Sequence, residues 1–492
     1  MVNSKATKLN RLNIDSWPDH LIWLTVFFIT ILIILTVQLV LLPYVFPSWH
    51  AGNGLLIGGD WLAFHSIAVE AAEEIRSDDW SAWKLRPGGC FPAGVASAVY
   101  ALTTSAPWTL APLNAAVHAS TYSLVVKLLL LFVNSRKLAL ISAVPFTFFP
   151  SAMLWYTQIH RDGYNILGML MFVYGMLLIV GYEEKSRREG WGAISALSGI
   201  VIIWFVRPYI LDVYFFVGII LLLMAAVYLT FVALKNQVQW KTVLTKLVLF
   251  ATILAAISML SEADGSDKYR SEQLERSYYC GDAIMFFKSV DFTLPEEQYP
   301  DNYYHWENED WIPDSIENQL YSVAVLRSQA YPERFGETTG SIDYDISLHS
   351  VNDYFRYLPR ALQIAFIAPF PEHWFGEGGT EATTFFRRVS AFEMIIIYLM
   401  LLSLFYGLWL WRQKIEIYMI IVFSIVMMMP IVYGVPNIGT VYRYRYGYLM
   451  ILVVLGAAAL LRFVLKMYGH DGDKESSLLK RIRQLMIETS CK

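Results

Sequence analysis

Long apolar segments without charged residues constrain the fold of this chain more than any other feature. The first of them, Leu21 to Pro43, runs for 23 residues, enough for a helix that crosses the ~30 Å of hydrocarbon in a bilayer. Of all 492 residues, 56% are apolar and 16% are charged, and no water-soluble core is large enough to bury that much apolar surface. Backbone groups in lipid must be paired within each segment, so the segments are helices. The sequence therefore predicts an all-α polytopic membrane protein and excludes cytosolic, fibrous and disordered classes.

Basic residues indicate how these segments cross the membrane. We expect about ten transmembrane helices, and Lys and Arg gather in every second connection between them. Because basic connections stay in the cytoplasm, both termini are predicted to be cytoplasmic, and the other connections to lie on the outer face. The predicted helices are residues 21–43, 110–133, 138–159, 163–181, 191–206, 209–234, 242–261, 389–411, 415–435 and 446–465.

Acidic residues are concentrated in one predicted outer loop. Residues 262–388 hold 23 of the 42 acidic residues but only 10 of the 38 Lys and Arg. Residues 61–76 and 354–370 have the pattern of amphipathic helices that lie at the membrane surface. The predicted parts of the chain are a cytoplasmic N-terminus (1–20), a transmembrane module (21–261) with a first outer loop (44–109), an acidic outer loop domain of mixed structure (262–388), C-terminal transmembrane helices (389–465) and a basic cytoplasmic tail (466–492).

The first outer loop contains an acid in a conspicuous position. Gly58, Gly59 and Asp60 precede the amphipathic stretch, which includes His65. Asp is a good helix N-cap, and a carboxylate at the membrane surface is also a candidate general base. The two interpretations are compatible, and the sequence leaves both open.

Other charged residues lie at the outer ends of predicted helices, where basic residues are scarce. His160, Arg161 and Asp162 separate two of these helices, and Arg207 ends another. In a purely structural interpretation, Asp162 caps the following helix and Arg161 is its surface partner. Arg207, before Pro208, is then a snorkelling side chain. An Arg–Asp pair at the edge of the hydrocarbon is costly, so a functional role is the alternative.

The last outer turn alternates tyrosine with arginine, from Tyr442 to Tyr446. An aromatic belt at the membrane interface explains the tyrosines, but it does not explain two arginines on the outer face. Guanidinium groups are good bidentate ligands of phosphate. The pattern therefore predicts that Tyr442, Arg443 and Arg445 bind an anion.

Together these residues supply what glycosyl transfer from a lipid-phosphate sugar requires. A carboxylate accepts the proton of the attacking hydroxyl group, and cations stabilise the charge that grows on the departing phosphate. Because a phosphate leaves without a general acid, one base is enough, in contrast to the paired carboxylates of glycosidases.

At these positions the chain resembles the GT-C superfamily of integral membrane glycosyltransferases. The resemblance is to the protein O-mannosyltransferase and aminoarabinose-transferase type, particularly its bacterial envelope-polysaccharide relatives, and it covers residues ~20–210 and ~355–465. The segments that carry it are Gly58-Gly-Asp60, Gly88-Gly-Cys-Phe-Pro92, Pro150-Ser-Ala-Met-Leu-Trp155, His160-Arg-Asp162, Arg207-Pro208, Ala368-Pro-Phe-Pro371 and Gly439-Thr-Val-Tyr-Arg-Tyr-Arg445.

The resemblance implies roles for individual residues in a GT-C-like fold. Asp60 corresponds to the catalytic base and Asp162 to the acid near the sugar. Trp61 stands where many members have a second acid. His65 and His160 are substrate-binding candidates, and a divalent metal at these histidines is possible but not favoured. The candidates for holding the lipid phosphate are Arg161, Arg207, Arg443 and Arg445.

The leading hypothesis is an inverting glycosyltransferase that moves a sugar from a polyprenyl-phosphate donor to a lipid-linked glycan, glycolipid or protein. The alternatives are a lipid-diphosphate-dependent polysaccharide polymerase or ligase and, in a different class, a lipid-linked-sugar transporter or flippase. Membrane lipids are expected partners and nucleic acid is not. The sequence contains no Asn-x-Ser/Thr site, which favours a bacterial inner membrane with the active site facing the periplasm. Cys90 and Cys280 both fall in predicted outer loops, and their pairing stays open.

Overall fold

The structure, a computed structural model, describes residues 17–181, 186–235, 238–264, 304–330, 332 and 336–467. This part of the chain is mostly helical, with one two-stranded antiparallel hairpin of β1 (His50–Gly52) and β2 (Leu55–Leu56). Eight of its helices are long and apolar enough to cross a membrane. They are α2 (Asp19–Thr36, continued by a π-helical segment, Val37–Val45), α8 (Asp162–Val180), α9 (Ser186–Val206), α10 (Leu211–Leu234), α11 (Trp240–Asp264), α16 (Glu381–Trp411), α17 (Ile415–Gly434) and α18 (Ile438–Met467). The all-α polytopic architecture is thus confirmed.

The two remaining predicted crossings differ from simple spans. Residues 110–133 form α5 (Ala111–Leu129), which is more polar than the eight helices above. Residues 138–159 form α6 (Arg136–Phe148) and α7 (Pro150–Thr157), which meet at a bend of 66°. Pro150 has no N–H for a continuous helix and begins α7 instead. If this bent pair counts as one crossing, the described residues contain nine.

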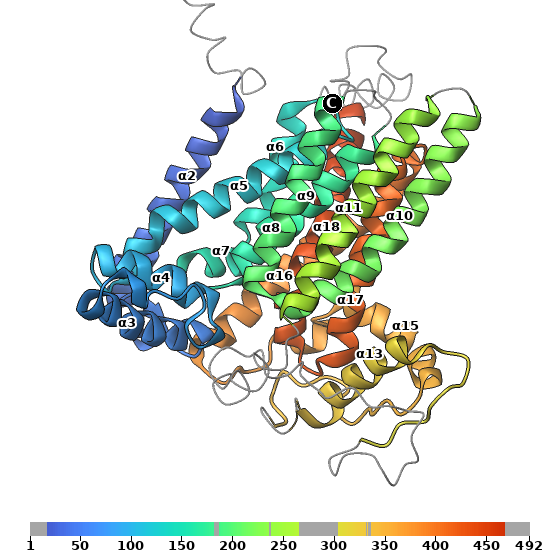
Figure 1. Cartoon of the computed structure of the whole chain (residues 1–492). Helices are drawn as coiled ribbons and strands as arrows, with labels where there is room; N and C mark the ends of the chain where they lie inside the picture. Colours follow the sequence, from blue (N-terminus) through green and yellow to red (C-terminus); the bar gives the residue numbers. More distant parts are fainter. Residues whose placement is uncertain are drawn as a thin grey trace, which may run out of the picture.

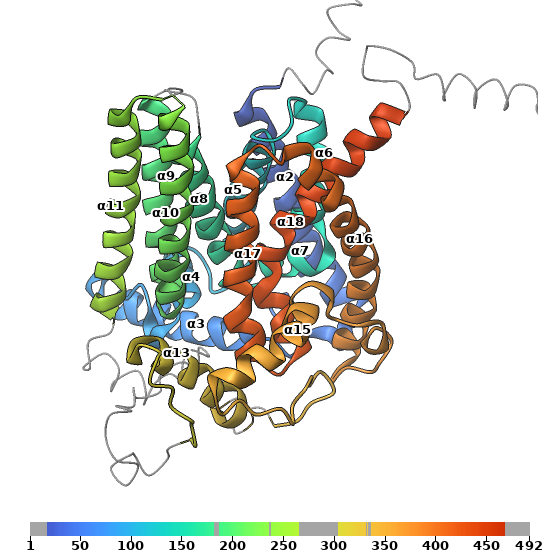
Figure 2. The same cartoon turned by 90° about the vertical axis from the view of Figure 1, so that its right-hand side faces the viewer.

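Shorter helices gather at one end of the bundle. These are α3 (Asp60–Asp78), α4 (Phe91–Leu102), α13 (Asp314–Val325) and α15 (Val351–Ile367), all at the lower end in Figures 1 and 2. The start of α2 and the end of α18 lie at the opposite end. The predicted amphipathic helices at 61–76 and 354–370 correspond to α3 and α15.

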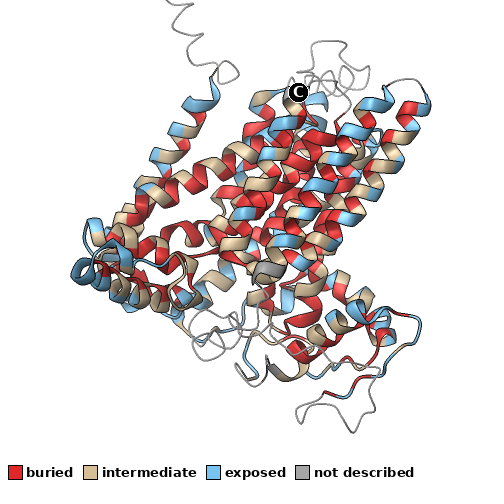
Figure 3. Cartoon of the chain, in the orientation of Figure 1, coloured by how far each residue is buried: buried red, intermediate tan, exposed pale blue. Residues whose placement is uncertain are grey.

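Close glycine contacts hold α8 against α9. A Cβ atom added to Gly175 would lie 2.4 Å from the carbonyl oxygen of Gly192, and one added to Gly199 would lie 2.4 Å from that of Gly168. Small residues of this kind let helix backbones approach closely in membranes. Helix α8 also lies in the interior of the bundle, where most of its residues are buried (Figure 3). This packing brings the first residue of α8 next to the residue that follows α9.

Buried polar contacts tie the segment after α13 to the long apolar helices. Arg327 lies just after α13 and is 2% exposed. Its guanidinium donates to the carbonyl oxygens of Val432 (3.5 Å) and Tyr433 (3.2 Å) at the end of α17, and to that of Ile346 (2.8 Å). Cationic donors satisfy the unpaired carbonyls of a helix C-terminus. The described part of the loop at 304–380 is therefore anchored on the bundle.

Two helices begin earlier than expected. Helix α16 starts at Glu381, within the segment 262–388 predicted as a loop domain, because Thr380 forms a capping box with Thr383. Helix α18 starts at Ile438, eight residues before the predicted span, and Asn437 Oδ1 accepts the N–H of Thr440 (3.0 Å). Arg387 and Arg388 of α16 and Arg443 of α18 lie in the helical residues before the predicted spans.

Candidate functional site

The turn before α3 sets the position of Asp60, the first residue of that helix. Gly58 has a φ of +84°, a conformation that side chains other than glycine rarely adopt. The indole N–H of Trp61 donates to a carbonyl of β2 and fixes the helix to the hairpin. The N-cap residue is Gly59, so the interpretation of Asp60 as the cap is wrong. The Asp60 carboxylate instead faces Arg443, with 3.1 Å between Oδ2 and Nη1, and its side chain is 45% exposed.

Asp162 is the first residue of α8 and its side chain is only 4% exposed. It forms an ion pair with Arg207, which follows α9 and is equally buried. Asp162 Oδ2 also lies 3.5 Å from Nε of Arg443. One guanidinium, that of Arg443, therefore joins the half-exposed Asp60 to the buried Asp162. These residues are far apart in the sequence but meet in one cluster.

His160 lies beside this cluster as a neutral ring. Its Nδ1 accepts the backbone N–H of Asp162 (3.2 Å). Burial lowers the pKa of His160 to about 4, although the neighbouring Asp162 opposes the shift. The ring packs against Trp61 and Phe64 of α3. His160 thus helps to hold the start of α3 next to the start of α8.

Tyr444 gathers the arginines of the cluster. Its hydroxyl lies 3.4 Å from Nη2 of Arg161 and 3.2 Å from Nη2 of Arg443. The guanidinium of Arg207 lies over its ring, 4.4 Å from the centroid, and that of Arg443 lies 4.9 Å away. Cation–π contacts of this kind are favourable when the groups are partly desolvated. The sequence had singled out Tyr442 and not Tyr444, although both lie in the same motif.

The charged neighbours of Asp60 determine its protonation state. Burial by itself raises the pKa of this carboxyl group, but Arg443, His160 and Arg161 lower it, and the net pKa lies below its usual value of 3.8. Asp60 is therefore ionised at neutral pH. Three arginines face two acids within the cluster, which leaves the site with an excess of positive charge for an anionic ligand.

Arg445 does not join the cluster. Residues 442–446 are helical, because α18 begins at Ile438, and two positions along a helix are about 200° apart around its axis. Arg443 and Arg445 therefore point to different sides. The guanidinium of Arg445 is fully buried and donates to the carbonyl oxygens of Ile364, Ala365 and Ala368 at the end of α15. It caps a helix C-terminus, and its predicted place beside a phosphate does not fit this geometry.

Tyr442 takes part in a second buried network. Its hydroxyl donates to Glu393 of α16 (2.6 Å). Glu393 also accepts the backbone N–H of Ser151 (3.0 Å) and its hydroxyl. Ser151 lies in the first turn of α7, where the bend leaves N–H groups without helical partners. Glu393 thus caps a broken membrane helix from a distant element, and its only sequence signal was an acid within the predicted span 389–411.

His65 lies away from the cluster, on a different side of α3. Its Nδ1 is 3.0 Å from the hydroxyl of Tyr100 in α4, and burial lowers its pKa. Arg76 donates to the backbone carbonyl of the same tyrosine. In the structure His65 therefore joins α3 to α4, and the geometry does not place it with the substrate-binding candidates.

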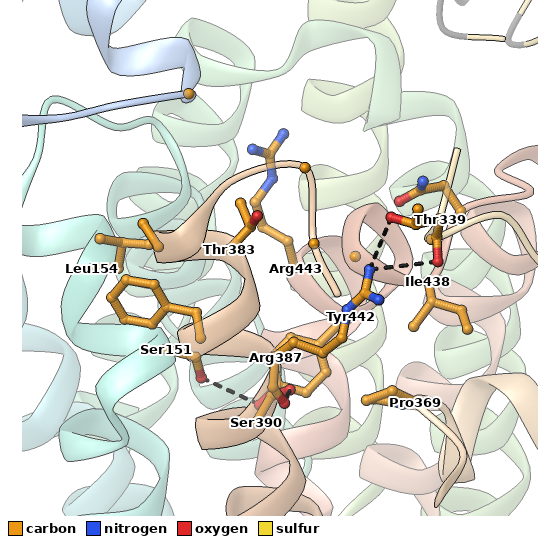
Figure 4. Close-up of a pocket in the computed structure, with 18 of the residues that line it drawn as sticks. Ser151, Leu154, Thr339, Pro369, Thr383, Arg387, Ser390, Ile438, Tyr442 and Arg443 are labelled. Carbon is orange, nitrogen blue, oxygen red and sulfur yellow. Dashed lines mark hydrogen bonds between the residues drawn. The ribbon is translucent and has the colours of Figure 1, made fainter. Parts of the chain in front are cut away.

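A cavity of about 630 Å³ opens beside Arg443. Figure 4 places Ser151 and Leu154 of α7 on one side of it and Thr339, Pro369 and Ile438 on the other, with Arg387 and Ser390 of α16 between them. Apolar and aromatic residues make up much of the wall, and Arg443 contributes a cation. The lining also includes Leu56, Trp61, Trp155, Phe386 and Tyr442. A charged rim over an apolar cavity is suited to an amphiphilic ligand.

The site offers few metal ligands. No group of three or more His, Cys, Asp or Glu side chains is placed to hold a metal ion within the ranges that the structure describes. Both carboxylates of the cluster face arginine instead. Cys90, at the start of α4, is disulfide-bonded. Cys280, its predicted possible partner, lies outside the described residues.

The arrangement can hold an anion at Arg443, which lines the apolar cavity and also pairs with the ionised, accessible Asp60 carboxylate. Comparison with models of protein families, with curated proteins and with solved structures finds no match to this chain.

Proposed function

We propose that the protein is an inverting glycosyltransferase that uses a polyprenyl-phosphate sugar. The observation that carries the proposal is the cluster of Asp60, Arg443, Asp162, Arg161 and Arg207, in which Arg443 also lines a cavity with largely apolar walls. Accessibility separates the two acids, because only Asp60 is open to an incoming acceptor. Asp60 is the base and Asp162 positions the arginines.

The proposed reaction has one chemical step. An acceptor hydroxyl attacks the anomeric carbon of the donor sugar, and its proton passes to Asp60. The bond between that carbon and the phosphate oxygen breaks, and the electron pair leaves with the polyprenyl phosphate. Arg443, already fixed by Asp162 and Tyr444, stabilises the charge on the departing oxygen. The attack comes from the face opposite the phosphate, so the anomeric configuration inverts.

The pairing of Asp60 with Arg443 has a consequence for the base. A carboxylate with a lowered pKa is a weak base while it is held by an arginine. A bound phosphate competes with Asp60 for the same guanidinium. When Arg443 turns to the phosphate, Asp60 loses the partner that lowers its pKa most and becomes more basic. Donor binding thereby prepares the base in the same complex that needs it.

The cavity suits the carrier lipid. Its wall between α7 and α16 is lined by Leu154, Trp155 and Phe386, and Arg443 stands at the cluster. An isoprenoid chain among the apolar residues places its phosphate next to the guanidinium. In this proposal the fold is GT-C-like and the site faces the periplasm of a bacterial inner membrane. The acceptor is a lipid-linked glycan, a glycolipid or a protein.

The test is the variant Asp60→Asn in a transfer assay with a panel of polyprenyl-phosphate sugars, using protein in purified membranes. Glu73→Gln is the matched control, because Glu73 is an exposed acid on the same helix. We expect Asp60→Asn to lose at least about 10²-fold in turnover, the usual contribution of a general base, and Glu73→Gln to be unaffected. Near-normal turnover of Asp60→Asn would reject the base assignment.

The same variant separates the alternatives. A lipid-diphosphate-dependent polymerase or ligase does not need the acid of the first outer loop, so its activity would survive in Asp60→Asn. A transporter or flippase would move a lipid-linked sugar across vesicles without forming a glycosidic product. Product formation that requires Asp60 excludes both.

A further inference from the structure

A second large cavity lies at the opposite end of the bundle from the arginine cluster. Its volume is about 910 Å³, and it is formed where α5 and α8 end, where α9 begins, and where α16 turns into α17. This is the upper end of the helices in Figure 1. The pattern of basic connections predicts that this end faces the cytoplasm. Nothing in the proposed reaction uses it.

The lining of this cavity combines cations with apolar walls. Lys127, Arg188 and Lys414 line it, against Glu416 as the one acid among the described lining residues. Leu131 and Tyr174 contribute to its walls. A cavity with this composition matches an anionic head group and the upper part of its acyl chains.

The basic side chains come from three separate elements, and the two lysines also contact protein groups. Lys127 Nζ lies 3.9 Å from Asp19 at the start of α2. Lys414 Nζ donates to the carbonyl oxygen of Leu131 and lies 5.6 Å from the centroid of the Phe132 ring. The Lys127 side chain is 45% exposed and Lys414 is exposed as well, so both ammonium groups are accessible to an anionic head group.

We propose that this cavity binds an anionic phospholipid of the cytoplasmic leaflet. Lys127, Arg188 and Lys414 contact the head-group phosphate, and the apolar walls contact the glycerol backbone and the first methylene groups. The lipid then joins the ends of α5, α8, α9 and α17, and the opposite ends of α8 and α9 carry Asp162 and Arg207 of the arginine cluster. This site is independent of the glycosyl-transfer proposal.

The test compares lipids that remain bound to the purified protein. Wild-type protein is reconstituted in nanodiscs with equal amounts of phosphatidylglycerol and phosphatidylcholine, and bound lipids are counted by native mass spectrometry. The test variant carries Lys127→Gln, Arg188→Gln and Lys414→Gln. The control variant carries Lys241→Gln, Arg462→Gln and Lys466→Gln, which remove the same charge from that end of the bundle outside the cavity.

We expect the wild type and the control to retain phosphatidylglycerol over phosphatidylcholine about fivefold or more, the preference that roughly one basic residue near a membrane surface supplies. The test variant should lose this preference. Equal preference in all three proteins would overturn the proposal, as would loss of preference in the control. If the triple variant does not fold, the single change Lys414→Gln at an exposed side chain replaces it, with partial loss expected.

Excess inorganic phosphate distinguishes a lipid from a free anion. If phosphatidylglycerol stays bound in its presence, the apolar walls contribute and the ligand is a lipid. If phosphate displaces it completely, the cavity is a simple anion site and the lipid assignment is wrong.

Discussion

Asp60 and Asp162 should respond in opposite ways to the same substitution, although both face Arg443. Asp162 and Arg207 are a buried pair, with side chains 4% and 5% exposed. Asp162→Asn leaves the charge of Arg207 buried without its partner, which costs about 3–5 kcal/mol of stability. Asp60 and Arg443 are 45% and 25% exposed, and water screens such a pair, so Asp60→Asn costs at most about 1 kcal/mol.

The assay is reversible unfolding in mixed detergent micelles, followed by tryptophan fluorescence, with transfer activity measured on the same samples. Asp60→Asn should keep the stability of the wild type and lose turnover. Asp162→Asn should lose stability, and the double variant Asp162→Asn, Arg207→Gln should lose less, because it removes both buried charges. The reasoning is refuted if Asp162→Asn costs no more than Asp60→Asn, or if the double variant is less stable than Asp162→Asn alone.

Three further outcomes follow from the same contacts. Arg445→Gln should destabilise the protein by about 3 kcal/mol in the unfolding assay, since it leaves carbonyls at the end of α15 unpaired. The folded fraction should keep the wild-type KM, and a raised KM would instead place Arg445 at the donor. Gly175→Ala should separate α8 from α9 and lower both stability and turnover, because its Cβ would lie 2.4 Å from a carbonyl oxygen. In the control Gly190→Ala, the added Cβ meets no atom within 4 Å, so this variant should behave as the wild type. The pKa of Asp60 is lowered and that of His160 is about 4, so both groups stay deprotonated as pH falls until about pH 4. The value of kcat/KM should therefore be flat from about pH 5 to 8. A loss of rate around pH 6 would identify another group as the base.

The charged cluster was predictable because topology restricts where such residues can meet. Asp162 and Arg207 each lie at the outer end of a predicted span and Asp60 lies in the predicted first outer loop, and successive spans return to the same face of the membrane. Helix packing at α8 and α9 then places two of them side by side. The sequence pattern therefore identified which residues lie on one face, and the structure adds which of them touch.

The different contacts made by Tyr442, Arg443 and Arg445 were not predictable from the alternating pattern of these residues. Tyr442 to Tyr446 alternate as in an extended turn, but the segment belongs to α18. In a helix, Arg443 turns to the cluster, Arg445 turns to α15, and Tyr442 reaches Glu393. The predicted span began only at residue 446, because the earlier residues include two arginines, whereas the helix starts at Ile438, where Asn437 Oδ1 accepts the N–H of Thr440.

The contacts that stabilise the bend between α6 and α7 could not be predicted from the sequence either. Proline at positions 145 and 150 is compatible with a break in a helix, but it does not predict that Glu393 of α16 satisfies the freed N–H of Ser151. That contact spans 242 positions, and only the packed bundle brings the two groups together. It matters for the site because α7 forms one wall of the cavity.

The most direct measurement of the central claim is a cryo-electron microscopy map of the protein in nanodiscs with a saturating polyprenyl phosphate. We predict density for the phosphate within hydrogen-bond distance of the Arg443 guanidinium, with the isoprenoid chain in the cavity between α7 and α16 and Asp60 released from Arg443. A phosphate bound elsewhere, or an Asp60–Arg443 pair that stays intact in a fully occupied complex, would contradict the account.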